Sequence, residues 1–332
     1  CCEECESGYW HFLIYPCDYS APVIDLHTHS NHSDGLDTPT ELVQKAAACG
    51  ISVLAITDHD TTSGWDEAIS AARREGIGLV PGIEVSTRSE IGNGRKISVH
   101  ILAYLPNPEH PELVTELAKT RNSRVSRARK MVDLLAGDYE ISWADIEAQI
   151  QPGATVGRPA IADALVTLGI VPTRSDAFTS ILHRTSPYYV SDHSLDTAQA
   201  IGLIRRAGGV SVMAHPLIDF PAGASELDLP TEHFEALITA GLDGVEVNHR
   251  SVPDFARRWL VALAQKHNLI QTGSSDYHGL GAKENLLAEN TTERRMPERM
   301  LERARVRDGA PFRLGFFFYF GKCIGIYFNV VI

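Results

Sequence analysis

The chain has 332 residues, of which 44% are hydrophobic and 22% charged, a composition that excludes a wholly disordered or fibrous protein. Its 42 acidic and 30 basic side chains leave a formal charge of −12, which argues against binding long nucleic acid through bulk charge. Five of the six cysteines lie near the chain ends, so no disulfide framework is expected. We therefore expect a reducing compartment, the cytoplasm.

The two ends of the chain differ in composition from its middle. Residues 1–22 carry no basic segment ahead of their short apolar stretch, which argues against a signal peptide. Residues 315–332 are aromatic and apolar and approach the length of a membrane span, although Lys322 and Asn329 interrupt them. We assign neither end a role in function, and we expect no membrane association unless the last segment is a genuine anchor.

Strand and helix patterns alternate through the first part of the chain, as in an α/β fold with parallel strands. The sequence Thr38-Pro-Thr-Glu41 has the pattern of a capping box with proline at the first helical position, and Gly50 ends that helix. A second helix is predicted at residues 64–75. Strands are predicted at residues 23–25, 52–57, 78–85 and 97–104.

The pattern changes after residue 105. Four helices are predicted in succession at residues 112–135, 143–149, 159–168 and 175–182. Alternation then resumes, with helices at 195–207, 231–240 and 253–267, and strands at 210–214, 244–247 and 269–272. We therefore predict a tail at 1–22, a first barrel part at 23–105, a helical insertion at 106–194, a second barrel part at 195–314 and an apolar tail at 315–332.

Side chains that could bind metal recur at or near the predicted strand ends. They are His27, His29, Asp58, His59, Glu84, His100, His215, Asn248, His249, Asp276 and His278. The carboxyl ends of parallel barrel strands meet at one face, so these groups should converge. His27-x-His29 and Asp276-x-His278 are i,i+2 pairs, which project to one side of an extended segment. Imidazole and carboxylate suit zinc, manganese and iron, which predicts metal-assisted hydrolysis.

Each of these residues alone has a plainer interpretation. A strand histidine such as His100 is more often a hydrogen-bonded core residue, and Asp34 or Asp60 could be only a turn or cap residue. The joint pattern outweighs these alternatives and predicts a metal site. The remaining histidines are interpreted as structural: His11, His32, His110, His183, His193, His233 and His267.

Five motifs in order resemble the PHP (polymerase and histidinol phosphatase) family. They are Asp25-Leu-His-Thr-His29 with Ser33-Asp-Gly35, Thr57-Asp-His-Asp-Thr61, Pro81-Gly-Ile-Glu84, Ala214-His-Pro216 and Ser275-Asp-Tyr-His-Gly279. The resemblance covers about residues 23–310 and is strongest to the small phosphoesterases that act on nucleoside 5′-monophosphates and 3′,5′-bisphosphates.

This resemblance implies a distorted (β/α)7 barrel, a TIM-like α/β fold with a helical insertion, that holds two or three divalent ions, usually manganese, iron or zinc. By matched position, one ion would take His27, His29, Glu84 and Asp276; a second would take Glu84, His100 and His215; and a third would take Asp34, His59 and His278. Asp34 stands where some members carry histidine, which leaves the third ion open.

The insertion supplies the predicted substrate contacts. Gly157-Arg158-Pro159 resembles the family's Arg-Pro-His segment, so Arg158 would grip phosphate, whereas Ala160 departs from the histidine. Basic residues at Arg121, Arg124, Arg127 and Lys130 form a stripe that is usually a solvated face. Alternatively, Arg121 and Arg124 contact the substrate phosphate or a short oligonucleotide. Asn248 is a further predicted contact.

The predicted reaction is hydrolysis of nucleotide phosphate monoesters by attack of a metal-bound hydroxide. Glu84 and Asp276 are predicted to act through the metals, and His249 to meet the charge on the leaving oxygen. The alternatives are a 5′→3′ exoribonuclease on short RNA and, less favoured, a histidinol phosphatase. An amidohydrolase is disfavoured because this chain has no evident counterpart of the bridging lysine of those enzymes. A non-catalytic metal-binding module is disfavoured because such modules typically lose ligands, whereas this chain retains every ligand position.

Overall fold

The computed structural model describes residues 21–92, 94–151, 154–191, 194–218 and 225–307. The predicted apolar tail at 315–332, most of the predicted tail at 1–22, and both His11 and His193 lie outside the described residues. Among the helices of the described ranges, none is both long enough and apolar enough to span a bilayer.

Strands and helices alternate through the first part of the chain, as predicted. The elements are β1 (Val23–Asp25), α1 (Pro39–Ala48), β2 (Ile51–Ile56), α2 (Trp65–Glu75), β3 (Gly78–Ile91) and β4 (Arg95–Tyr104). The capping box of α1 is present, because the Thr38 hydroxyl accepts from the Glu41 amide while the Glu41 carboxylate accepts from the Thr38 amide at 2.9 Å.

A run of helices follows, and alternation then resumes. The helical run is α3 (Pro111–Leu135), α4 (Trp143–Glu147), α5 (Arg158–Thr167) and α6 (Arg174–Thr179). The remaining elements are β5 (Leu195–Asp196), α7 (Thr197–Arg206), β6 (Val210–Met213), a 3-10 turn (Glu226–Asp228), α8 (Thr231–Thr239), β7 (Gly244–Asn248), α9 (Asp254–Lys266), β8 (Ile270–Gly273) and α10 (Arg295–Arg305). The helix predicted from residue 195 begins at Thr197, because Asp196 caps it through the amides of Ala198 and Gln199.

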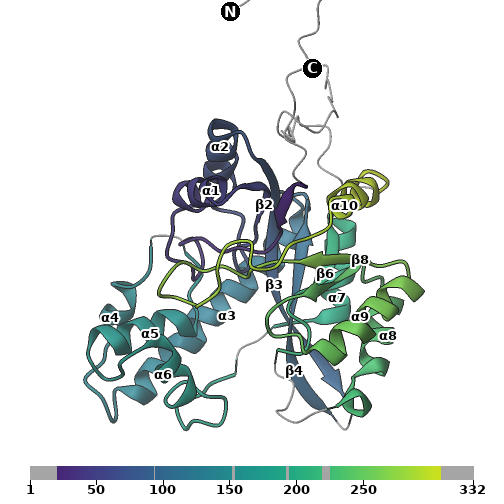
Figure 1. The fold of residues 1–332 in the computed structure, drawn as a ribbon. Helices are drawn as coiled ribbons and strands as arrows, with labels where there is room; N and C mark the ends of the chain where they lie inside the picture. Colours follow the sequence, from purple (N-terminus) through teal and green to yellow (C-terminus); the bar gives the residue numbers. More distant parts are fainter. Residues whose placement is uncertain (1–20, 93, 152–153, 192–193, 219–224, 308–332) are drawn as a thin grey trace, which may run out of the picture.

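The strands form one sheet in the order β1-β2-β3-β4-β6-β7-β8, with β5 paired to β3 outside this order. The two ends of the sheet approach each other where Thr28, after β1, forms a parallel bridge with Tyr277, after β8. Helices α7–α9 lie on one side of the strands and α3–α6 on the other (Figure 1). The expected α/β fold, a distorted barrel, is confirmed.

The expectation of parallel strands is wrong at β4. β4 pairs antiparallel with both β3 and β6, and its hairpin with β3 extends from the pair Gly82–Tyr104 to the pair Ile91–Arg95. The residues between Ile91 and Arg95 are too few for the crossover that parallel strands require. As a consequence, β3 runs beyond its predicted end, and His100, which was predicted within a strand, lies inside the resulting hairpin.

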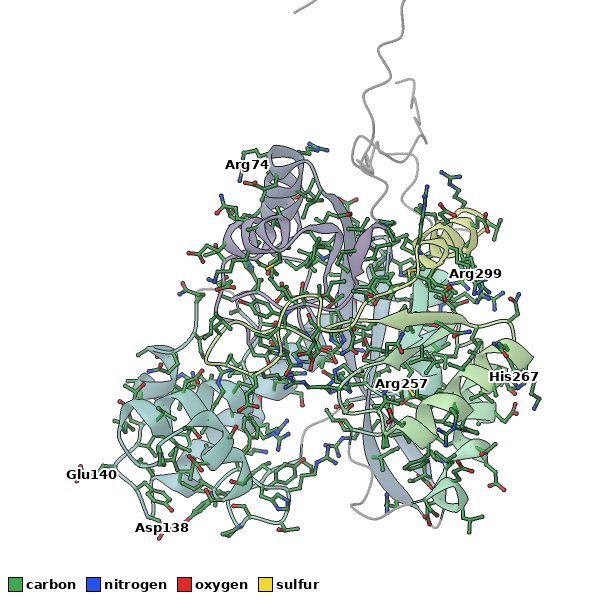
Figure 2. All side chains as sticks on the ribbon, in the orientation of Figure 1. Arg74, Asp138, Glu140, Arg257, His267 and Arg299 are labelled. Carbon is green, nitrogen blue, oxygen red and sulfur yellow. The ribbon has the colours of Figure 1, made fainter. Side chains whose placement is uncertain are left out.

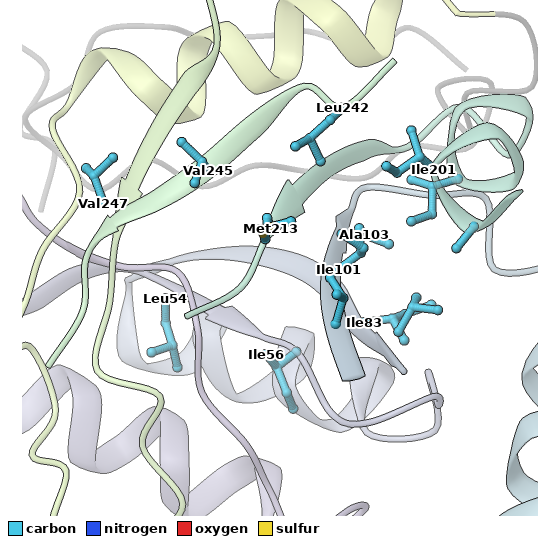
Figure 3. Packing of buried hydrophobic residues seen from close by; sticks show 14 of the residues in the cluster. Leu54, Ile56, Ile83, Ile101, Ala103, Ile201, Met213, Leu242, Val245 and Val247 are labelled. Carbon is cyan, nitrogen blue, oxygen red and sulfur yellow. The ribbon is translucent and has the colours of Figure 1, made fainter. Parts of the chain in front are cut away.

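The strands bury both of their faces. In β2, Leu54 and Ile56 join a cluster with the side chains of α1 and α2, whereas Val53 and Ala55 belong to a second cluster. Figure 3 shows part of the first cluster, in which Ile83, Ile101 and Met213 of neighbouring strands pack with Ile201 of α7. The second cluster includes four residues of α10, a helix that the sequence patterns left unassigned: Met296, Met300, Leu301 and Ala304.

Helices α3–α6 have an apolar core of their own. It contains Met131 and Leu135 of α3 together with Ile161 and Leu165 of α5. The first half of α3 instead joins the barrel, since Leu113 belongs to the cluster that contains the strands. The insertion boundary at residue 106 therefore remains a prediction. Charged side chains such as Asp138 and Glu140 project from the outer edge of this helical group (Figure 2).

Candidate metal centre

The nine side chains predicted to bind metal are Glu84 and eight others that lie around it. His27 and His29 follow β1 and Asp34 follows in the next loop; His59 follows β2, Glu84 lies in β3, His100 lies in β4, His215 follows β6, and Asp276 and His278 follow β8. Eight of the nine form three overlapping groups, because Glu84, His29 and His59 each belong to two of them. His215 joins through Glu84, with its Nε2 2.8 Å from Oε1 of that carboxylate. The structure thus brings together residues that are up to 251 positions apart, from 27 to 278.

The most deeply buried group consists of His27, His29, Glu84 and Asp276. The Nε2 atoms of His27 and His29 lie 3.2 and 3.1 Å from Oε2 of Glu84. The same two nitrogen atoms lie 3.5 and 3.4 Å from Oδ1 of Asp276. Two imidazoles and two carboxylates therefore converge on one point, as in a protein metal site.

A second group shares the Glu84 carboxylate. Oε1 of Glu84 lies 2.7 Å from Nδ1 of His100 and 2.8 Å from Nε2 of His215, while Oε2 lies 3.3 Å from Nδ1 of His59. Glu84 pairs with Leu102 across the hairpin, so His100 is its diagonal neighbour on the same face. The antiparallel course of β4 therefore still delivers His100 to the site.

A third group surrounds Asp34. Its Oδ1 lies 3.3 Å from Nε2 of His278 and 3.8 Å from Nδ1 of His29, and its Oδ2 lies 3.7 Å from Nε2 of His59. Although aspartate is shorter than the histidine that some family members carry here, Asp34 comes close to the histidines that would bind an ion with it.

Buried atoms without hydrogen bonds show that the cluster is suited to divalent ions. Nδ1 of His59 and Nε2 of His278 have no hydrogen-bond partner, although each faces a carboxylate oxygen at 3.3 Å. Buried polar atoms are nearly always hydrogen-bonded, so such exceptions require an explanation. A divalent ion held between imidazole nitrogen and carboxylate oxygen would satisfy both partners, and these donors fit manganese, iron or zinc.

The carboxylates also set the protonation of the histidines. Burial lowers the pKa of His29, but hydrogen bonds to Asp276 and Glu84 outweigh it and raise this pKa to about 9. Burial would raise the pKa of Glu84, yet His59 and His100 hold it well below its usual range. Burial instead lowers the pKa of His59 and of His278, which favours their neutral forms. Without an ion, the cluster therefore combines an ionised Glu84 with a protonated His29, and an arriving dication displaces the His29 proton.

Three carboxylates outside the predicted ion-ligand sets hold the segments of the site in place; of these, only Asp58 was among the side chains predicted to converge. Glu246 of β7 accepts from the amide of His215 at 2.6 Å and lies 3.4 Å from Nδ1 of His27, which orients a predicted ligand. Asp25 accepts from the amide of Ser275 at 3.0 Å, and burial raises the pKa of Asp25 to about 6. Asp58 accepts from Ser30 and Ser33 in the loop that carries Asp34. A charged residue inside the apolar strand Val245-Glu-Val247 was the available signal for Glu246.

Three site segments contain non-glycine residues in the left-handed region of backbone space. The φ angles of Asp60, His215 and Asp276 are 54°, 26° and 53°. This conformation costs about 1–3 kcal/mol for a residue with a side chain and persists where the surroundings enforce it. The enforced turns point His215 and Asp276 towards the cluster.

The cluster opens into a cleft with two lobes. The lining residues that both lobes share are His59, Ser98, His100, Arg158, Arg184, Ile218 and Lys283. The apolar lobe has a volume of about 720 Å³ and lies along the β3–β4 hairpin and α8; its apolar lining includes Ile97, Val99, Met213, Leu217 and Phe234. The basic lobe has a volume of about 670 Å³ and reaches the insertion. It is lined by the described cations Arg88, Lys96, Arg124, Arg127, Arg158, Arg174, Arg184 and Lys283.

The predicted substrate residues in the insertion occupy different positions. Arg158 lines both lobes, donates to the Leu182 carbonyl at 3.2 Å and lies over the Phe178 ring. Arg124 lines the basic lobe, with its Nε 3.0 Å from Oδ2 of Asp60. Arg121 is outside both linings and donates to the Asp60 carbonyl at 2.6 Å.

The predicted residues at the end of β7 and directly after it do not line the described cleft. Asn248 is exposed, and neither Asn248 nor His249 is among the described residues that line the two lobes. The side chain of His249 is 2% exposed; its Nδ1 pairs with the Ser251 hydroxyl at 2.8 Å, and its Nε2 lies 3.8 Å from Oδ2 of Asp276. Of the histidines interpreted as structural, His233 lines the apolar lobe, whereas His32 and His267 pair with Ser63 and Glu235.

Histidine and carboxylate clusters at one mouth of an α/β barrel, beside a basic cleft, define the class of metal-dependent phosphoesterases. The PHP domain model matches residues 25–141. The chain belongs to the PHP family, and the resemblance drawn from its motifs is confirmed.

Two curated relatives and one solved structure support this membership over most of the chain. The chain is 36% identical to a 3′,5′-nucleoside bisphosphate phosphatase of Chromobacterium violaceum over 78% of its own length and 88% of that protein. It is 36% identical to a 5′-3′ exoribonuclease of Haemophilus influenzae over 76% of its own length and 89% of that protein. A solved structure from Bifidobacterium adolescentis, named as a metal-dependent phosphoesterase, is 40% identical with a TM-score of 0.77, covering 86% of this chain and 98% of that one.

Proposed function

We propose that this phosphoesterase hydrolyses the phosphate monoesters of small nucleotides, with two or three divalent ions bound at the cluster. The observation that carries the proposal is the position of Glu84. Both oxygens of this one carboxylate face histidines, and the cluster that Glu84 joins opens directly into a basic lobe. Bridging carboxylates and neighbouring cations are what a phosphate ester requires for binding and hydrolysis.

The ligands are assigned as the family resemblance implies, and the geometry supports this assignment. His27, His29, Glu84 and Asp276 hold one ion; Glu84, His100 and His215 hold a second; and Asp34, His59 and His278 hold a third. When bound, manganese, iron or zinc ions supply Lewis acidity and lower the pKa of water.

The protein's own groups bind and orient the substrate. Arg158, held over Phe178 and beside Leu182, presents its guanidinium to both lobes of the cleft. A planar guanidinium can donate two parallel hydrogen bonds to phosphate oxygens. The apolar lobe accepts the remainder of the nucleotide, since its volume of about 720 Å³ lies within the range of small-molecule sites. In this arrangement the insertion acts as a cap that closes over the phosphate.

A substrate panel with added manganese tests the proposal. It contains adenosine monophosphate, adenosine 3′,5′-bisphosphate, histidinol phosphate and a short 5′-phosphorylated RNA, with phosphate release as the readout. We expect the two adenosine nucleotides to be hydrolysed fastest, in keeping with the bisphosphate activity named for the Chromobacterium relative. Faster turnover of histidinol phosphate, or no phosphate release from any member, would overturn the proposal.

A 5′→3′ exoribonuclease acting on short RNA is the second candidate. The basic lobe favours it, because Arg88, Lys96 and Arg127 extend positive charge beyond the cluster along the hairpin and α3. The Haemophilus relative is named for that activity. Labelled dinucleotides incubated beside a mononucleotide separate the two functions, since only an exonuclease would cleave the internal diester.

A further inference from the structure

Lys283 lies between the metal cluster and the cleft, at a position that the sequence motifs did not predict. Its Nζ is 2.8 Å from Oδ2 of Asp276, and its side chain lines both lobes. The other oxygen of Asp276, Oδ1, faces Nε2 of His27 and His29. The carboxylate is therefore divided, with one oxygen directed to the predicted ion and the other to an ammonium group.

The loop that carries Lys283 is fixed by close packing. Gly279 has a φ of 98°, and a Cβ at this position would lie 2.8 Å from Cβ of Leu36. The side-chain amide of Asn285, which is buried, donates to the Ser275 carbonyl at 2.7 Å. Only glycine fits the first of these positions without strain. The backbone on both sides of Lys283 is thus anchored, which sets where its ammonium group reaches.

Neither fold stability nor metal binding explains this ammonium group. The Lys283 side chain is 41% exposed, and ion pairs with an exposed partner contribute little to stability. A positive charge beside a carboxylate ligand also opposes the approach of a divalent cation. The Lys283 ammonium group thus weakens ion binding and adds little to fold stability. An anionic substrate that enters the cleft would give this positive charge a function.

We propose that Lys283 is a catalytic residue whose ammonium group contacts the phosphoryl oxygens of the substrate while it remains paired with Asp276. This inference rests on the proposed function. An ammonium group has three N–H donors, so it can serve Asp276 and a phosphoryl oxygen together. His249, which was predicted to act near the leaving oxygen, is buried and paired with Ser251, whereas Lys283 faces the cleft.

The test uses the full chain with Lys283→Met and, as a matched control, Lys266→Met. Lys266 also pairs with a carboxylate, Glu235 at 2.7 Å, but it lies on the outer surface of α9. Three quantities are measured: manganese affinity, the affinity of the manganese-loaded protein for inorganic phosphate by calorimetry, and kcat/KM for adenosine monophosphate. Lys283→Arg, which keeps the charge, is the conservative variant.

We expect Lys283→Met to bind manganese at least as tightly as the wild type and to bind phosphate about 10- to 100-fold more weakly. Its kcat/KM falls by at least the same factor, Lys283→Arg recovers part of both losses, and Lys266→Met matches the wild type. Weaker manganese binding with unchanged phosphate affinity would overturn the inference in favour of a positioning role through Asp276. Unchanged values throughout would also overturn it. If the wild type hydrolyses no nucleotide but binds phosphate through Lys283, the proposed function fails and this contact stands.

Discussion

The barrel mouth and the helical insertion present two kinds of functional residue. At the barrel mouth, short side chains such as His27, Glu84 and Asp276 leave strands or their ends and have little freedom. In the insertion, long side chains such as Arg121 and Arg158 extend from helices, and each donates a hydrogen bond to the backbone of another segment. The backbone fixes the positions of the barrel-mouth side chains, whereas the positions of the insertion arginines depend on packing between the two regions. Four changes sharpen this comparison, beginning with the largest expected effect.

Glu84→Gln should abolish the function of the barrel mouth. The change removes the charge that both oxygens of Glu84 present to the surrounding histidines, so metal content and kcat/KM should fall together, the latter by more than about 10³-fold. Glu90→Gln, on the exposed end of the same strand, is the control and should behave as wild type. Metal analysis beside kinetics checks this, and full metal content in Glu84→Gln would contradict the ligand assignment.

Manganese affinity should rise with pH by at least about tenfold for each unit between about pH 7 and 9. The pKa of His29 in the metal-free cluster is about 9, so below that pH an ion must displace its proton, and above it this dependence disappears. Calorimetry in buffers of different ionisation enthalpy measures the protons released. An affinity that does not change with pH would mean that the histidines are neutral before the ion binds.

Arg158→Ala tests the insertion and should leave the barrel mouth intact. We expect unchanged manganese content and a roughly 10- to 100-fold loss in kcat/KM, mostly through KM, because a charged hydrogen bond to phosphate is lost. Arg129→Ala is a matched control, since Arg129 also lies over an aromatic ring, that of Trp143, outside the linings of both lobes. Loss of metal in Arg158→Ala would erase the distinction between the two regions.

Arg121→Ala should have the smallest effect on activity. The structure uses this guanidinium to hold the Asp60 carbonyl, so we expect a loss of about 1–2 kcal/mol in the free energy of unfolding and little change in KM. Denaturant titration and kinetics together check this. A large rise in KM would instead support the substrate contact that the basic stripe suggested.

The sequence predicted the α/β alternation well, because buried strands and capped helices leave local patterns. It did not predict that β4 runs antiparallel, since alternating elements usually imply parallel strands. The glycines at positions 92 and 94 were the available sign of a hairpin. α10 was missed because Pro297 interrupts its pattern near the start, although a proline is tolerated in the first turn.

The same contrast applies to the candidate site. Histidines two residues apart in an extended segment project to the same side of the chain. The convergence of His27 with His29 therefore followed from their spacing alone. The partners of Glu246 and Lys283 depend on contacts between distant segments, which no local pattern encodes. Likewise, nothing in the order of residues distinguishes Arg121, which supports a turn, from Arg158, which faces the cleft.

The shared helix α3 has a consequence for how such enzymes could be recombined. It is a rod of 25 residues, rooted by Leu113 and Leu117 among the strands and ending with Met131 and Leu135 in the insertion. A chimaera that exchanged the insertion at residue 106 would replace the first half of α3, and with it the residues that pack against the strands. Exchange of insertions between relatives should instead join the two chains within α3, beyond Leu117. The contacts of α3 with the strands are then kept, and the helix sets the direction of the grafted insertion.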